Sequence, residues 1–420
     1  MKRFHYFLLL SLLCVQAIHV VAETTIINAD GYVDVAAGKL IQPATIVVEN
    51  GRISLINPDL IPAGDIINLD GYTLLPGFMD CHVHLGSFQA PGGQLRGVTE
   101  TPAATAFRAE KHAEQTLMAG FTTVRNVGSR YFVDVELAKF SERDELPAPR
   151  IIPAAHAISI TGGHGDNGGY SPFVVEQEDY KGGVADGVDE IIRAVRYQIK
   201  HGAKVIKFTA TAGVLSFEEA VGAQQFTDEE MRAIVEEANR HGLKVAAHAH
   251  GSEGIMAAVK AGVDSIEHGS MLTPDIIREM KKRGTYLVPT SYIGDVFDYD
   301  AVPPLLQEKA RKVIPIMLNS LAMAIKADVN IAFGTDAGVI PHGKNAGEFG
   351  AMVKQGMTKA DAIRTATVNA ADLLGVKDRG QIKLGLLADI VAVEGNPLED
   401  VSILTDVRFV MKGGKIYKNQ

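Results

Sequence analysis

Short runs of β-branched and other apolar residues, broken by turn residues, dominate both ends of the chain. Near the start, an Asn-Gly pair at 50–51 separates two such runs, which is a strong signal for a β-hairpin. Near the end, a Gly-Gly pair at 413–414 separates two more. We therefore expect residues 23–75 and 384–420 to pair into one small β-domain.

Between these ends, strand-like apolar runs alternate with helix-like segments, which favours a parallel sheet with crossover helices. The strand-like runs lie at 78–84, 122–127, 151–160, 204–209, 244–250, 265–268, 286–290 and 330–334. Residues 228–242 are typical of the helices, with acidic residues in the first turn and a glycine at the end. Eight such units predict an α/β fold in which residues 76–383 form a (β/α)8 TIM barrel beside a small β-sandwich.

The first 22 residues have the features of a secretory signal peptide. A basic start at Lys2 and Arg3 precedes an apolar run, and small residues end at Ala22. The alternative is a membrane anchor, which Gln16 and His19 within a short apolar stretch disfavour. We expect cleavage after Ala22, a periplasmic or secreted protein, and no membrane association afterwards.

Composition narrows the functional classes. The 420 residues are 46% hydrophobic and 22% charged, which excludes a disordered, collagen-like or coiled-coil chain. The net charge is −9 and no Lys/Arg-rich block occurs, so we expect no nucleic-acid partner. Only two cysteines are present, Cys14 and Cys81, and they cannot form a disulfide framework.

Residues able to bind metal lie at the ends of four predicted strands, where barrel enzymes hold their active sites. They are His82, His84, His248, His250, His268 and Asp336. Residues two apart on a strand share a face, so His82 and His84 both point into the barrel. Each residue alone is more often structural, but four strand ends together favour a metal site. Several imidazoles with a carboxylate suit zinc, although other divalent metals accept the same ligands.

Lys207 occupies the fourth strand at a position that alternation directs into the barrel mouth. An ammonium there would be repelled by bound metals unless the side chain were modified. The alternative is a lysine paired with a nearby carboxylate, which is the common state of a buried lysine.

These residues lie in longer motifs, namely PGFMDCHVHLG, AGFTTVRNVG, TGGHGD, VAAHAHG, DSIEHGS, FGTDAG and VIPHGKNA. With them the chain resembles the amidohydrolase superfamily over essentially its whole mature length. It is most similar to the imidazolonepropionase-like branch, which contains metal-dependent Xaa-Pro and Xaa-Arg dipeptidases and ochratoxin-cleaving amidases. The motifs are specific for this branch but much less specific for the substrate.

The resemblance implies a binuclear zinc centre. His82, His84 and Asp336 would bind one metal, and His248 and His268 the other. Lys207, carboxylated by carbon dioxide, would bridge both, and the anionic carbamate would remove the charge conflict. An amide would then be attacked by a hydroxide that bridges the two metals, with Asp336 passing its proton to the leaving amine.

Further roles are expected for residues that follow the predicted strands, and for Tyr292 the expectation comes from the dipeptidase relatives. His164, just after the third strand, would support the developing oxyanion. His250 and Tyr292 would face the substrate, with an ordinary loop aromatic as the alternative for Tyr292. His342 is equally compatible with binding a substrate carboxylate and with capping its own loop.

The predicted function is a periplasmic or secreted amidohydrolase that cleaves dipeptides or N-acyl amino acids. The alternative within enzymes is a hydrolase of a cyclic or aryl amide, like imidazolonepropionase or an ochratoxin amidase. A binding protein on a decayed barrel is disfavoured because every expected ligand position is filled. A homo-oligomer is an alternative to a monomer. Asp295, Asp298 and Asp300 would favour a basic substrate side chain if they lined the pocket, and otherwise form a solvated surface.

Overall fold

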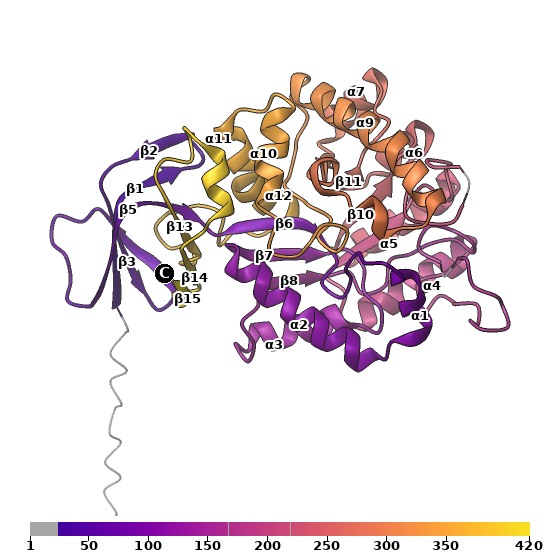
Figure 1. Ribbon diagram of the computed structural model, residues 1–420, viewed down its shortest axis with the longest axis horizontal. Coiled ribbons are helices and arrows are strands. Elements are labelled where there is room, and N and C mark those ends of the chain that lie inside the picture. Colours follow the sequence, from indigo (N-terminus) through magenta and orange to yellow (C-terminus); the bar gives the residue numbers. More distant parts are fainter. Residues whose placement is uncertain (1–23, 167, 219) are drawn as a thin grey trace, which may run out of the picture.

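The computed structural model of this 420-residue chain describes residues 24–166, 168–218 and 220–420. It consists of a barrel of strands and helices with a smaller β-domain at one side (Figure 1). The predicted signal peptide, residues 1–22, lies outside the described residues. Within the described residues, no helix combines the length and the apolar character needed to cross a membrane.

The β-domain is built from both ends of the chain, as the sequence predicted. Its strands follow the order β15-β14-β13-β5-β1-β3-β4, with β2 paired to β1. The strands are β1 (Thr24–Asp34), β2 (Lys39–Ile41), β3 (Ala44–Glu49), β4 (Arg52–Ile56), β5 (Asp65–Pro76), β13 (Ile390–Glu394), β14 (Phe409–Lys412) and β15 (Lys415–Asn419). In Figure 1 the yellow C-terminal strands accordingly lie beside the indigo N-terminal ones.

The sheet folds over so that its two ends meet, which produces the expected sandwich. Asn50 and Gly51, at φ 52° and 74°, form the predicted β3–β4 hairpin turn. Both left-handed residues match a turn that follows the twist of the strands. Gly51 O accepts a hydrogen bond from Ala388 N at 2.9 Å, and a Cβ on Gly51 would lie 2.5 Å from Gly413 O. One apolar cluster, including Ile46 and Phe409, fills the interior.

The barrel contains two parallel sheets that hydrogen bonds join into a closed ring. Its strands are β6 (Phe78–Val83), β7 (Phe121–Asn126), β8 (Arg150–Pro153), β9 (Val205–Thr209), β10 (Lys244–Ala249), β11 (Ser265–His268) and β12 (Tyr286–Val288). Lys204 N donates to Pro153 O at 2.7 Å, which connects β8 to β9. Leu287 N donates to Asn330 O and Cys81 N to Phe333 O, both at 2.8 Å, so residues 330–333 connect β12 back to β6.

Two predicted strands differ from the structure. The third ends at Pro153 rather than at residue 160, because Ala155 turns the chain at φ 58°, and only Ile158 bridges to the next strand. Residues 330–334 contribute an isolated bridge instead of a regular strand, because Phe333 N donates to Thr365 O outside the barrel ladder. Both positions still complete the ring.

Helices surround the barrel strands, and residues of several of them also line the cavity at the carboxyl ends of these strands. The helices are α1 (Arg96–Thr99), α2 (Pro102–Met118), α3 (Val133–Glu142), α4 (Val188–Lys200), α5 (Asp228–Arg240), α6 (Ser252–Ala261), α7 (Pro274–Arg283), α8 (Ile293–Val296), α9 (Pro304–Lys326), α10 (Gly347–Lys354), α11 (Lys359–Arg364) and α12 (Ala370–Leu374). The helix predicted at 228–242 is α5, which begins with a capping box between Thr227 and Glu230. Its buried residues include Met231, Ile234 and Val235.

Candidate metal centre

A cavity of about 890 Å³ opens at the carboxyl ends of the barrel strands. This is the end at which barrel enzymes carry their active sites. The predicted site residues that line it are His82, His84, His164, Lys207, His248, His250, His268 and Asp336. The structure therefore brings together residues on or directly after β6, β9, β10 and β11, together with residues from the loop after β8 and from the loop after residue 333.

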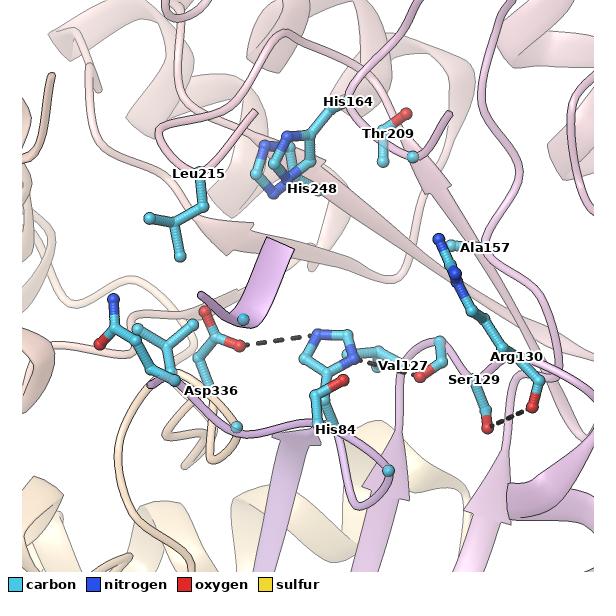
Figure 2. Close-up of a pocket in the computed structure, with 18 of the residues that line it drawn as sticks. His84, Val127, Ser129, Arg130, Ala157, His164, Thr209, Leu215, His248 and Asp336 are labelled. Atoms are coloured by element: carbon cyan, nitrogen blue, oxygen red, sulfur yellow. Dashed lines mark hydrogen bonds and ion pairs between the residues drawn. The ribbon is translucent and has the colours of Figure 1, made fainter. Parts of the chain in front are cut away.

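His82, His84 and Asp336 form one group of potential metal ligands. Their donor atoms lie within 4.8 Å of one another. Asp336 Oδ1 lies 3.5 Å from His82 Nε2 and 3.6 Å from His84 Nε2, and Figure 2 shows the contact with His84. The two imidazole atoms and the carboxylate thus converge on one point, as the ligands of a single cation do.

A second group consists of His248, His250 and His268, again with donor atoms within 4.8 Å of one another. The rings of His82 and His268 are 5.0 Å apart at their centroids, so the two groups are adjacent. His248 Nε2 is buried and has no hydrogen-bond partner among the described residues. A buried acceptor or donor without a partner is costly unless a ligand satisfies it.

Lys207, in the middle of β9, lines the same cavity as these histidines. Its side chain is buried, and its ammonium makes no hydrogen bond or ion pair within the part of the chain that is described. Burial lowers the Lys207 pKa to about 8, and the carboxylates of Glu267 and Asp336 oppose that shift. Its positive charge in turn lowers the pKa values of the surrounding imidazoles.

The protonation states fit a metal site. Burial lowers the pKa of His84 to about 4 and holds those of His82, His248 and His268 well below the usual value. Near pH 7 the imidazoles are therefore neutral, which is the form that binds metal. Burial raises the Asp336 pKa to about 6, so this carboxylate is mostly ionised at the same pH. Neutral imidazoles, a carboxylate and an unpartnered His248 Nε2 together fit divalent cations.

Residues behind the ligands hold them in place, and sequence reasoning assigned them no role. Glu267 Oε2 lies 2.7 Å from His82 Nδ1, and Arg125 Nη2 donates to Glu267 Oε1 at 2.7 Å. Thr290 Oγ1 lies 2.8 Å from His268 Nδ1. Their place in the sequence could have indicated a role, because Glu267 lies in the DSIEHGS motif and Arg125 in the AGFTTVRNVG motif. Such partners orient a ligand and fix its tautomer.

Two residues of the centre adopt a left-handed backbone that non-glycine residues rarely adopt. The φ angle is 69° at His268 and 58° at Asp336. Asp336 is held there by its own backbone N–H, which donates to His82 O at 2.8 Å. Strained backbone of this kind concentrates at functional sites, where the surrounding structure compensates its cost.

His164 and His250 both face the cavity. The His164 ring stacks on His248 with centroids 4.1 Å apart, as Figure 2 shows, and its Nδ1 lies 2.7 Å from Ser216 Oγ. A Cβ at Gly213 would lie 2.1 Å from the His164 ring, so only glycine admits this close approach. His250 Nδ1 lies 2.7 Å from Ser270 Oγ, and its ring stacks on His268.

The structure does not bring Tyr292 or His342 to the cavity wall. The Tyr292 ring packs against Gly347, where a Cβ would lie 2.2 Å from it. The His342 ring stacks on His112 at 4.1 Å, and its Nε2 lies 3.1 Å from Ser87 O. Local packing explains both positions. The Tyr292 ring fills the space beside Gly347, and the His342 ring fills the space beside His112.

Comparison with known proteins identifies the class. A family model described as the amidohydrolase family matches residues 73–417. The ochratoxinase of Aspergillus niger is 34% identical over 424 residues, covering 94% of this chain and 87% of that protein. A crystal structure of a Xaa-Pro dipeptidase with bound methionine in the active site is 39% identical with a TM-score of 0.91, covering 94% of this chain and 100% of that one.

A crystal structure of a prolidase complexed with N-methylphosphonate-L-proline is 31% identical with a TM-score of 0.86, covering 94% of this chain and 100% of that one. The chain belongs to the amidohydrolase family, in the branch that its motifs indicated. It is a hydrolase that acts on amide bonds, and the two histidine groups are its potential metal sites.

Proposed function

We propose that the protein hydrolyses the amide bond of dipeptides or N-acyl amino acids with two divalent metals, zinc in the first instance. The observation that carries this proposal is the pair of ligand groups around Lys207 at the base of one cavity. Two relatives support the substrate class, because one solved dipeptidase holds methionine in its active site and one prolidase is bound to a phosphonate derivative of proline.

His82, His84 and Asp336 would hold one metal, and His248 and His268 the other, with His250 close enough to contribute. Bound metals of this kind lower the pKa of water and polarise a carbonyl oxygen. The Asp336 carboxylate lies with His82 and His84 in one ligand group, and burial raises its pKa to about 6. It is therefore ionised at neutral pH, able to accept a proton, and able to return it to the leaving amine.

His164 is placed to stabilise negative charge on the substrate carbonyl oxygen. In the tautomer whose proton is on Nε2, Nδ1 accepts from the Ser216 hydroxyl and this neutral ring can donate a hydrogen bond from Nε2. Burial lowers the His164 pKa to about 3, so the ring remains neutral during the reaction. A neutral donor fixed in position stabilises a developing oxyanion without first reorganising.

We also propose that Lys207 is carboxylated. With a pKa of about 8, a fraction of its amine is neutral near pH 7 and can add to carbon dioxide. The nitrogen forms a bond to the carbon and loses a proton, which gives an anionic carbamate with two oxygen donors. Incubation with ¹³C-bicarbonate and metal should give a carbamate carbon resonance that is absent from Lys207→Met.

The test of the function is release of free amino acid from an array of dipeptides and N-acyl amino acids by the zinc-loaded protein. Asp336→Asn should abolish release while the protein remains folded. If no amino acid is released from any member of the array although two metals are bound per chain, the proposal is wrong. A second candidate is an aryl amide, which the similarity to ochratoxinase favours, so the array includes carboxylate-free aryl amides.

The cellular location of the protein is part of the same proposal. The basic start, apolar run and small residues before Glu23 support export to the periplasm or the exterior. Mass spectrometry of the protein made in a bacterial host should find Glu23 as the first residue. An intact N-terminus in a soluble cytosolic fraction would contradict export.

A further inference from the structure

One face of α9 forms part of the cavity wall. The residues of this helix that line the cavity are Leu306, Ala310, Val313, Ile314 and Met317. Their spacing of three and four residues places them on a single face of the helix. All are apolar and all are at most 9% exposed. The neighbouring Ile316 lies outside the lining and is 43% exposed, so the helix presents one face to the cavity and another to solvent.

Other elements extend this apolar surface. Ile293 and Phe297 from the α8 segment, Val302 before α9, and Val214 and Leu215 after β9 also line the cavity. Figure 2 shows Leu215 beside the cluster that contains His84, His248 and Asp336. We call these five residues and the α9 face the apolar chamber. It lines the same cavity as the candidate metal centre.

The acidic residues that would attract a basic side chain do not lie in this chamber. Asp295 pairs with Lys354 at 2.5 Å, and Asp298 accepts a hydrogen bond from Asp300 N. None of these three aspartates lines the cavity. The described acidic residues that do line it are Glu100, Glu178 and Asp336, which come from other elements.

Those acids are also engaged elsewhere. Glu100 makes ion pairs with Arg108 and Arg96. The Glu178 carboxylate lies against Gly182, in the loop after β8. Asp336 belongs to the ligand group with His82. A cationic group entering the chamber would therefore lose its hydration without meeting a counter-charge, which is strongly unfavourable.

We propose that the apolar chamber selects amide substrates carrying a bulky, uncharged apolar group, aromatic or branched aliphatic, next to the scissile bond, and rejects lysine and arginine side chains. The proposal rests on the proposed function and adds the substrate class. Burying the apolar group supplies binding free energy in proportion to its area, and an ammonium in the same place has no partner.

The experiment compares phenylalanine with lysine on each side of the amide in two matched series. We expect the wild-type kcat/KM to favour phenylalanine by more than about 100-fold in one series, since a buried unpaired charge costs more than a missing methylene. The series that shows the preference identifies which side enters the chamber. Equal rates for both residues in both series would overturn the proposal, and this comparison needs no variant to fold.

A variant then tests the chamber itself. Met317→Glu introduces a carboxylate on the cavity face of α9 and should reduce the phenylalanine preference by at least about tenfold. Ile316→Glu is the matched control, since it adds the same charge one residue away on the exposed face, and it should leave the preference unchanged. A folded Met317→Glu with the wild-type preference would also overturn the proposal.

Ligand binding separates this proposal from the proposed function. Calorimetry on the metal-loaded protein with 4-phenylbutyrate and 6-aminohexanoate compares an apolar and a cationic group on similar carboxylates. We expect the phenyl ligand to bind at least about tenfold tighter and Met317→Glu to remove that difference. If no amide is cleaved but this pattern holds, the proposed function fails and the chamber stands. If amides are cleaved but the phenyl ligand binds no tighter than the cationic one, the proposal for the apolar chamber is overturned and the proposed function is not.

Discussion

Glu267 connects His82 to Arg125 in the interior of the barrel. Its Oε2 lies 2.7 Å from His82 Nδ1, and its Oε1 accepts from Arg125 Nη2 at 2.7 Å. All three side chains are buried to within 1% exposure. Because Glu267 occupies Nδ1, the other ring nitrogen of His82 is the one directed at Asp336. Arg125 balances the charge of the carboxylate and is itself anchored to Cys81 O at 2.6 Å.

Glu267→Gln should therefore weaken metal binding although Glu267 is not a ligand. The neutral amide leaves Arg125 without its counter-charge and orients His82 less firmly. We expect about 10–100-fold lower metal affinity and a loss of about 3–5 kcal/mol in the free energy of unfolding. Chelator competition and urea denaturation measure the two. Glu236→Gln, on the exposed side of α5, is the control. Wild-type affinity in a folded Glu267→Gln would contradict the role.

Strand periodicity explains why part of this site could be predicted. It requires only local backbone geometry, and it places His82, Lys207 and His248 in the barrel mouth, where the structure has them. His268 is different, because alternation directs Glu267 inward and would direct the next residue outward. The left-handed backbone of His268 turns its ring back into the mouth. A motif match could suggest that position, but hydrophobic periodicity could not.

Long-range packing explains what the sequence did not provide. The contact between Arg125 and Glu267 joins residues 142 apart in the chain, and nothing local marks them as partners. The positions of Tyr292 and His342 depend in the same way on Gly347 and His112, on other segments. Barrel closure at residues 330–334 depends on hydrogen bonds to two different strands, which a search for one regular strand cannot reveal.

Tyr292→Phe should consequently leave catalysis almost unchanged. The Tyr292 ring packs on Gly347 away from the cavity wall, and phenylalanine keeps that packing. We expect kcat/KM within about twofold of wild type, as for a substitution that alters no catalytic contact. Steady-state kinetics on the best amide substrate checks this, with Asp336→Asn as the inactive reference. A loss above about tenfold would restore the substrate-binding role that the sequence suggested.

Lys309 links α9 to the loop that carries the partner of His164. Its Nζ donates to Ser216 O at 2.7 Å and to Glu218 O at 2.8 Å. Ser216 Oγ in turn holds His164 Nδ1. If His164 stabilises the oxyanion as proposed, Lys309 is a positioning residue that acts on it through two backbone carbonyls and the loop between them.

Lys309→Met should lower kcat by about 10–100-fold through misplacement of His164, with a smaller effect on KM. Lys309→Arg keeps the donors and should restore part of the rate, which a purely packing role would not predict. Lys312→Met is the matched control, because Lys312 lies on the exposed side of α9 and pairs with Glu308. Equal kcat for Lys309→Met and wild type would refute the positioning role.

Glu348, at the start of α10, should make the stability of the protein depend on pH. Burial raises its pKa to about 8, although it accepts hydrogen bonds from Ser291 and from Tyr292 N. A carboxyl group with a raised pKa in the folded state binds more protons there than when unfolded. The stabilising effect is complete below the unfolded pKa near 4.5 and is lost as the pH rises to about 8.

Glu348→Gln removes the titrating carboxyl group. The stability of the variant should therefore fall less than that of wild type as the pH rises. Between about pH 5 and 8 the free energy of unfolding of wild type, relative to the variant, should decrease by about 1.4 kcal/mol per pH unit at most. Urea denaturation of both proteins at several pH values measures the difference and cancels the other titrating groups that they share. Parallel pH profiles would show that Glu348 has the same pKa in the folded and unfolded chains.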